Sequence, residues 1–287
     1  MIAYASQVLA ARALIALTLA SCGGKHAPSG GDGKLQNAFP DGPPLATPGE
    51  HMSYQLALRG IQLAEFDLAI GDVTDLDGAK VVPVTMHAQS TGIARLVAKV
   101  DDRFTTWLDI ATGRPRRFEC EEFAVHGKPD IEHVLVDLVH RAGETMPVTV
   151  WVNAGSPRQE TQAVTAREIW DLASFLVVLR AWEGATGSRV ATEVFRSRHL
   201  WKLDIRIAER GVRPTALGDL PALRFDAHAT KVDRQGRPTA AAQRKFMLWV
   251  SDDNDRVPLA IVADTDFGKL ELSIVDYQPG TGRRLRP

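Results

Sequence analysis

Apolar and polar residues alternate along most of the chain after Met52. In residues 201–207, tryptophan, leucine and two isoleucines occupy every second position, and lysine, aspartate and arginine stand between them. Successive side chains of a β-strand point to opposite faces, so this period gives a strand with one buried and one wet face, as in antiparallel sheets. The same alternation recurs in residues 54–59, 82–89, 148–153 and 223–229. A chain with this pattern is restricted to a mainly β fold.

Two segments depart from the period of two. Apolar side chains recur at helical spacing in residues 92–100, and residues 167–182 carry the broad apolar stripe of a largely buried helix. Glycines at positions 60, 71, 78, 113, 127, 143 and 218 separate the strand segments as turn signals. About twelve strands and two helices predict a strongly curved antiparallel sheet or incomplete β-barrel, with one or two short helices packed on its concave side.

The N-terminus carries a different signal. Arg12 precedes a short apolar run at residues 13–20, and Leu19-Ala20-Ser21-Cys22 resembles a bacterial lipobox, in which the cysteine is lipidated and becomes the first residue of the mature protein. The run is far shorter than the ~20 apolar residues that a membrane-spanning helix needs. We therefore predict lipidation at Cys22. The alternative is a buried or amphipathic N-terminal helix with an incidental cysteine.

Composition predicts how the rest of the chain is divided. Residues 1–21 are expected to be a signal peptide, and residues 22–48 the lipidated cysteine with a flexible Gly/Pro-rich tether. One β-rich domain is expected over residues 49–278, followed at residues 279–287 by a basic tail that frays into solvent. Gly23 stands where a well-known retention signal of enteric bacteria places aspartate. This favours the outer membrane, with the domain facing the periplasm.

No motif for catalysis, a metal or a cofactor is recognised. The 34 basic and 35 acidic residues nearly balance, which gives no electrostatic case for a nucleic-acid partner. Cys120 follows Phe118 at strand spacing and is expected to be a buried thiol. The histidines are scattered, and residues 252–255 lack the pattern of a calcium loop and are expected to form a tight turn. We therefore predict no metal, no cofactor and a non-enzymatic protein.

Several short motifs, in order, resemble one bacterial family. They are Gly49-Glu50-His51-Met52-Ser53-Tyr54, Ser90-Thr91-Gly92, Lys99 to Phe104, Asp109 with Pro115 to Phe118, Asp171-Leu172-Ala173-Ser174, Leu179-Arg180, Leu248 to Asp253, Arg256-Val257-Pro258 and Phe267-Gly268. The family is the domain of unknown function 3108, and the resemblance covers residues 49–277. It implies a secreted or lipid-anchored envelope protein that is rich in β-structure and has no established reaction or ligand. One departure is Ala64-Glu65-Phe66, at a turn where the family often has glycine.

The expected function is binding. We predict a lipid-anchored envelope protein that holds an apolar ligand, or a protein partner, against its concave face. The residues predicted to line that face are Phe104, Phe118, Trp170, Phe175, Leu179 and Trp249. Two alternatives stay open, a structural or assembly scaffold and a hydrolase of envelope material. The only candidates for catalysis are Asp101, Asp102 and His133, and a paired-carboxylate mechanism would need them to converge in space.

Overall fold

The structure is a computed structural model, and it describes residues 35–36, 39–97, 99–126, 128–153, 155–265 and 267–287. Cys22 lies outside the described residues, as does the predicted signal peptide. The described part is mainly β, as the alternation predicts, and its strands number seventeen. The expectation of about twelve was too low because several strands are two or three residues long and carry no periodicity to detect.

The strands follow one another along the chain with two helices between them. Their bounds are β1 (Leu35–Gln36), β2 (His51–Leu58), β3 (Ile61–Ile70), β4 (Thr74–Leu76), β5 (Ala79–Ser90), α2 (Gly92–Val97), β6 (Asp101–Asp109), β7 (Pro115–His126), β8 (Lys128–Asp137), β9 (Thr145–Val152), β10 (Arg158–Ala163), β11 (Ile169–Asp171), α3 (Leu172–Arg180), β12 (Arg189–Arg196), β13 (His199–Thr215), β14 (Gly218–Val232), β15 (Pro238–Ser251), β16 (Pro258–Thr265) and β17 (Gly268–Gln278).

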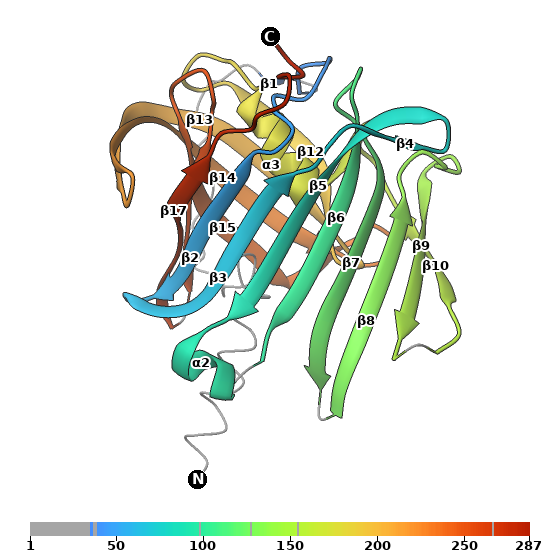
Figure 1. Cartoon of the computed structure of the whole chain (residues 1–287). Coiled ribbons are helices and arrows are strands. Elements are labelled where there is room, and N and C mark those ends of the chain that lie inside the picture. Colours follow the sequence, from blue (N-terminus) through green and yellow to red (C-terminus); the bar gives the residue numbers. More distant parts are fainter. Residues whose placement is uncertain (1–34, 37–38, 98, 127, 154, 266) are drawn as a thin grey trace.

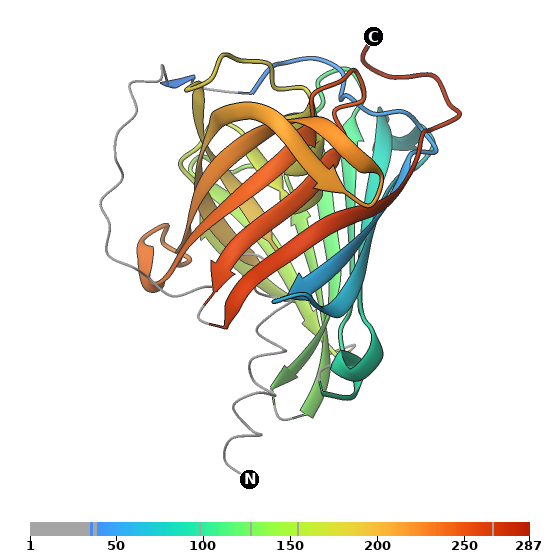
Figure 2. The same ribbon diagram turned by 90° about the vertical axis from the view of Figure 1, so that its left-hand side faces the viewer.

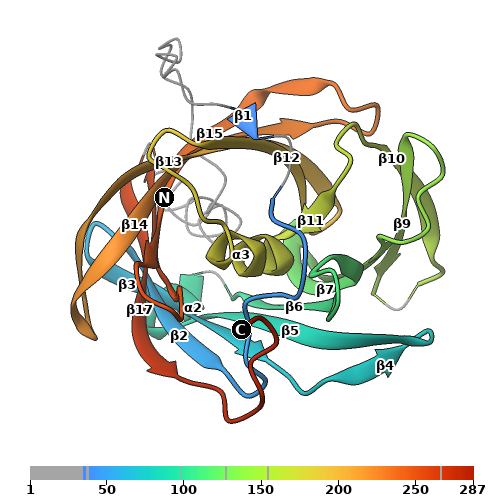
Figure 3. The same ribbon diagram turned by 90° about the horizontal axis from the view of Figure 1, so that it is seen from above.

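Antiparallel pairing joins nearly all strands into one sheet. The succession runs β10-β9-β8-β7-β6-β5-β3-β2-β17-β16-β15-β14-β13-β12, and β4 pairs with the upper part of β5. The short strands β11 and β1 add to β12 in parallel. The sheet is not closed by this ladder, but it curls around α3 to form an incomplete barrel (Figure 3).

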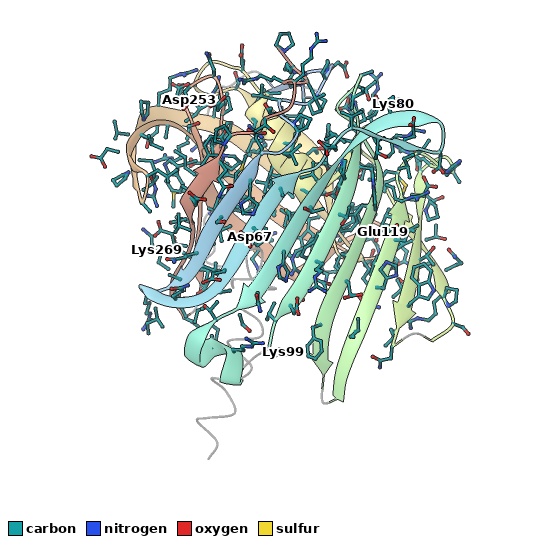
Figure 4. All side chains as sticks on the ribbon, viewed as in Figure 1. Asp67, Lys80, Lys99, Glu119, Asp253 and Lys269 are labelled. Atoms are coloured by element: carbon teal, nitrogen blue, oxygen red, sulfur yellow. The ribbon has the colours of Figure 1, made fainter. Side chains whose placement is uncertain are left out.

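Burial follows the predicted alternation. On β13, Trp201, Leu203, Ile205 and Ile207 are buried, whereas Lys202, Asp204 and Arg206 lie on the other face. Asp67 and Glu119, both labelled in Figure 4, belong to such an outward face, since they alternate with buried neighbours on β3 and β7. The inner faces of the strands and α3 share one continuous hydrophobic core.

Helix α3 lies inside the ring of strands, as predicted, but it is shorter than the apolar stripe of residues 167–182 (Figure 3). Residues 169–171 are a strand instead, because Ile169 and its two successors pair in parallel with β12. Asp171 then begins the helix, since its side chain accepts hydrogen bonds from the backbone N–H groups of Ala173 and Ser174.

Helix α2 does not lie on the concave side. It joins β5 to β6 at the lower end of the barrel in Figure 1, and it contacts β3. The prediction of a second helix is therefore confirmed, although it ends at Val97 rather than residue 100.

Two predicted boundaries are wrong. Within the expected tether, Phe39, Leu45 and Ala46 are buried, and the Phe39 ring packs edge-on against Trp170, Phe175 and Trp182 at 5.6–6.1 Å between centroids. The expected frayed tail is also docked, because the N–H groups of Gly282 and Leu285 donate to the carbonyls of Pro48 and Ala46. Segments 39–48 and 279–287 therefore cover the upper end of the barrel together (Figure 2).

Candidate functional site

The interior of the barrel contains an apolar cavity beneath α3, here called the α3 pocket. Its volume is about 70 Å³, and it opens in part to solvent. Its lining comes from one helix and nine strands: Leu56, Ala64, Glu65, Phe66, Ala88, Asp102, Phe104, Leu172, Phe175, Leu176, Val194, Arg196, Leu203, Phe246, Leu248, Ile261 and Leu272. All but three of these residues are apolar.

A buried ion pair fixes the C-terminal end of α3 over this pocket. The Arg180 guanidinium binds the Glu50 carboxylate through two hydrogen bonds of 2.7 and 3.1 Å, and both side chains are only 2% exposed. Tyr277 donates a further hydrogen bond to Glu50, and Arg180 also donates to the backbone carbonyl of Asp255. Burial alone would raise the pKa of Glu50, but the hydrogen bond and charge of Arg180 hold that pKa below its ordinary value.

The N-terminal end of α3 is held by the Asp171 carboxylate. Besides capping the helix, it accepts hydrogen bonds from the hydroxyls of Ser174 at 2.6 Å and of Thr106 on β6 at 2.5 Å. Asp171 is fully buried, and this burial raises the pKa of its carboxyl despite those four donors. Buried polar contacts therefore hold both ends of α3 against the barrel wall.

These contacts explain several of the short motifs in the sequence. Glu50 and Tyr54 belong to the first motif, and the Tyr54 hydroxyl donates to the carbonyl of Pro258, a member of a later motif, at 2.9 Å. Asp171 and Arg180 mark the two ends of the helical motif. These motif residues thus hold α3 in place inside the sheet.

One end of the pocket is polar. Asp102 on β6 lines it with Phe104, and Arg196 on β12 lies opposite. Asp102 accepts a hydrogen bond from the N–H of Phe123, yet burial raises the pKa of its carboxyl to about 7, and the nearby Glu122 adds to the rise. Arg196 forms an ion pair with Glu122 at 3.3 Å.

Ion pairs bridge the two ends of the sheet near this polar end. Arg196 reaches Glu122 on β7, and Arg198, in the turn after β12, reaches Glu132 on β8 at 3.4 Å. Arg234, in the turn between β14 and β15, pairs with Glu160 on β10, and its carbonyl accepts the N–H of Ala163. These ion pairs and this turn thereby connect the β10 end of the sheet with its β12 end.

The structure places the six predicted ligand-binding residues in different surroundings. Phe104 and Phe175 line the α3 pocket. Phe118 stacks behind Phe104, with 6.5 Å between ring centroids, and is fully buried. Trp170 and Leu179 are buried on the side of α3 away from the pocket, in the part of the core that contains Phe39.

Trp249 is on the wrong face for the predicted binding wall. Leu248 and Val250 face inward, so Trp249 faces outward, where the Arg213 guanidinium lies 4.5 Å from its ring centroid. The pocket residues that were not predicted include Val194, Leu203 and Phe246. Each occupies an inward position of an alternating strand, and only the curvature of the sheet brings them to one cavity.

The three hydrolase candidates do not converge. Asp102 faces the interior, whereas Asp101 and His133 lie on the outer face. Asp101 binds His87 at 2.8 Å, and this hydrogen bond lowers the pKa of its carboxyl. His133 stacks on Trp151, with 4.8 Å between ring centroids. A paired-carboxylate site made of Asp101 and Asp102 is therefore excluded by their opposite orientations.

Two structural predictions about polar residues are confirmed. Cys120 is buried, and burial raises the pKa of its thiol well above the ordinary value. Residues 252–255 form a turn in which Asp253 accepts hydrogen bonds from the N–H groups of Asp255 and Arg256. Within the described ranges, no group of three or more histidine, cysteine or acidic side chains is arranged to hold a metal ion. Nor does any helix there have the length and apolar character to cross a membrane.

Comparison with known proteins identifies the family. The sequence pattern of the protein family of unknown function DUF3108 matches residues 52–275, most of the chain. The chain belongs to this family. None of the curated proteins compared with it matches.

One solved structure shares the fold of this DUF3108 member at low sequence identity, and others are less similar. A β-barrel-like protein of domain of unknown function DUF1849 from Brucella abortus is similar, with a TM-score of 0.50 at 8% identity over 82% of this chain and 99% of that chain. A Bacteroides fragilis protein described as exported with a YmcC-like fold (4% identity; 83% and 99% covered) and a Parabacteroides distasonis protein described as a lipoprotein (6% identity; 83% and 100% covered) each give 0.37. Scores below 0.5 do not establish a shared fold.

Proposed function

We propose that this DUF3108 protein is a non-enzymatic, lipid-anchored envelope protein that holds an apolar molecule in the α3 pocket. The observation that carries the proposal is the pocket itself, whose walls are almost entirely apolar. Cores normally pack with few voids larger than a water molecule, so an apolar space of about 70 Å³ inside the barrel is a feature that an apolar ligand would fill. A hydrolase is disfavoured because its candidate residues face opposite sides of the sheet.

The anchor belongs to the same proposal. Two or more acyl chains on Cys22 would hold the protein stably on a membrane, whereas one chain binds only marginally. We place the protein at the outer membrane, with the barrel in the periplasm. Support comes from the lipobox resemblance and from Gly23 after the cysteine. Replacement of Cys22 by alanine should move the protein from the membrane to the soluble fraction without changing its unfolding temperature.

A pocket-blocking variant tests the ligand. Ala88 is buried on β5 and lines the pocket, so Ala88→Phe should fill part of the cavity. The neutral fluorescent probe 1-N-phenylnaphthylamine should bind the full chain carrying Cys22→Ala, and Ala88→Phe should weaken this binding at least about tenfold, a loss of ~1.4 kcal/mol.

The matched control is Ala69→Phe, on the outward face of β3. It should leave probe binding unchanged. Absence of probe binding to the parent chain, or equal binding by both variants in their folded state, would show that the pocket does not take an apolar ligand. A scaffold role would then be the better account.

A further inference from the structure

A second cavity opens to solvent at the upper end of the barrel, and it is here called the upper cleft. Its volume is about 800 Å³, within the ~300–1,000 Å³ of typical small-molecule sites. Its lining comes from the C-terminal end of α3, from the turn between β15 and β16, and from the two segments 39–48 and 279–287 that cover this end of the barrel (Figure 2). Asp253, labelled in Figure 4, belongs to that turn. The two docked segments therefore enclose a space in addition to covering the core.

The buried and the accessible parts of the upper cleft differ in chemistry. Leu45, Ala181 and Trp182 line it and are at most 8% exposed, so they give the cleft an apolar floor. Eight of the thirteen lining residues nevertheless carry a charged or amide side chain, and Glu183 and Asp253 among them are exposed. This combination suits a ligand that has small apolar groups and charged groups together.

Most charges of the upper cleft are neutralised within the protein. Besides the buried ion pair at the end of α3, the Arg256 guanidinium pairs with the Asp252 carboxylate at 3.5 Å. Arg284 pairs with Asp255 at 3.1 Å. These pairs hold the turn between β15 and β16 against α3 and segment 279–287, and they leave little net charge for a ligand.

Three lining side chains keep a charge that no opposite charge neutralises. Arg286 donates through Nε to the carbonyl of Pro43 at 2.6 Å and through Nη2 to the carbonyl of Asp41 at 3.1 Å, so its guanidinium binds backbone only. Asp253 accepts hydrogen bonds from one hydroxyl and two backbone N–H groups, all through the same carboxylate oxygen. In the part of the chain that the structure describes, neither these two side chains nor Glu183 forms an ion pair. The upper cleft therefore presents one cation and two carboxylates.

We propose that the upper cleft binds a short peptide through both of its charged ends. The peptide carboxylate lies against Arg286, whose Nη1 is left for it by the backbone contacts. The peptide ammonium lies against Glu183 and Asp253, and small side chains lie on the apolar floor. A guanidinium matches a carboxylate in geometry, and hydrogen bonds between charged groups are about twice as strong as neutral ones. This site is separate from the α3 pocket and does not depend on a ligand there.

The test compares peptides that differ only in the charge of their ends. Tetraalanine, N-acetyl-tetraalanine and tetraalanine amide are titrated by calorimetry into the full chain carrying Cys22→Ala. Each blocked peptide should bind about tenfold more weakly than tetraalanine, the effect of losing one charged hydrogen bond. Ala88→Phe, which fills part of the α3 pocket, should leave tetraalanine binding unchanged.

Two variants assign the charges. Arg286→Met should bind tetraalanine and its amide equally while still discriminating against the acetylated peptide. The double variant Glu183→Gln/Asp253→Asn should do the reverse, and it keeps the hydrogen-bonding oxygen that the turn uses. Arg283→Met is the matched control, because Arg283 belongs to the same segment but is exposed and does not line the cleft, so it should change nothing.

The proposal fails if tetraalanine does not bind to the parent chain, or if the three peptides bind equally. It also fails if the folded double variant, which removes no ion pair of the protein, discriminates between the peptides as the parent does. Loss of all binding in Arg286→Met is still interpretable, because the double variant reports on the same site without touching the contacts of Arg286.

Discussion

At the scale of single residues, the polar groups inside the barrel have two different roles. Glu50, Arg180 and Asp171 are nearly inaccessible to solvent, and all their contacts are to neighbouring parts of the fold. Asp102 and Arg196 instead line a cavity. The first group positions α3, and the second determines the chemistry of the space beneath it.

The ion pair between Arg180 and Glu50 should be essential for stability. Arg180→Met leaves a carboxylate buried without its cation, which typically costs ~3–5 kcal/mol. Urea unfolding should show a loss of that order. Arg206→Met, which breaks a partly exposed pair with Asp226 on the outer face, should cost at most ~1 kcal/mol. Equal losses in the two variants would contradict the positioning role of Arg180.

Asp102 should make stability depend on pH. Its pKa is about 7 in the folded chain and 3.8 in the ordinary case, so the folded state binds the extra proton between those values. The contribution of this carboxyl to stability is therefore present below pH 4 and is lost as the pH rises through 7. Asp102→Asn cannot titrate, so its stability relative to the parent should increase from pH 4 to pH 8, by at most ~4 kcal/mol. A difference that stays constant across this range in urea unfolding would refute the raised pKa.

At the scale of elements, the sequence predicted the long strands well and the irregular segments poorly. Residues 201–207 alternate without interruption, and β13 has the expected faces. The start of α3 was predicted too early because Ile169 and Trp170 extend the apolar stripe, although they pair as a strand. Segment 39–48 was predicted to be a tether because it is rich in proline, contains a glycine and has a single aromatic residue, Phe39, which packs into the core. Such contacts depend on long-range packing, which local composition does not report.

Phe39 shows how much the segment before β2 matters. Its ring fills a space among three aromatic residues in and beside α3, so Phe39→Ala should lower the free energy of unfolding by ~3–5 kcal/mol. Phe267→Ala is the control, since that ring is 44% exposed and its loss should change stability by ~0.5 kcal/mol or less. A flexible tether would instead make Phe39→Ala as mild as Phe267→Ala.

At the scale of the whole molecule, the candidate site could be predicted only in part. Phe104 and Phe175 were chosen from their periodicity, and both line the pocket. Arg196 was not chosen, because an inward position on one strand does not reveal which side chains meet across a curved sheet. The sequence does carry one signal for Arg196. It stands an even number of residues after Val190 and Val194 on β12, so it lies on the same inward face as these two residues. Trp249 was predicted on the wrong face of the sheet, because the inward positions of its strand, β15, are those of Leu248 and Val250.

The most direct test of the account is to identify what the barrel contains. The full chain carrying Cys22→Ala is secreted, purified without detergent and denatured in organic solvent, and the released small molecules are measured by mass spectrometry. We predict close to one apolar molecule per chain, and a several-fold smaller yield from Ala88→Phe, whose added ring occupies the pocket. A chain that releases nothing, or that releases the same amount with Ala88→Phe, would contradict a ligand in the α3 pocket.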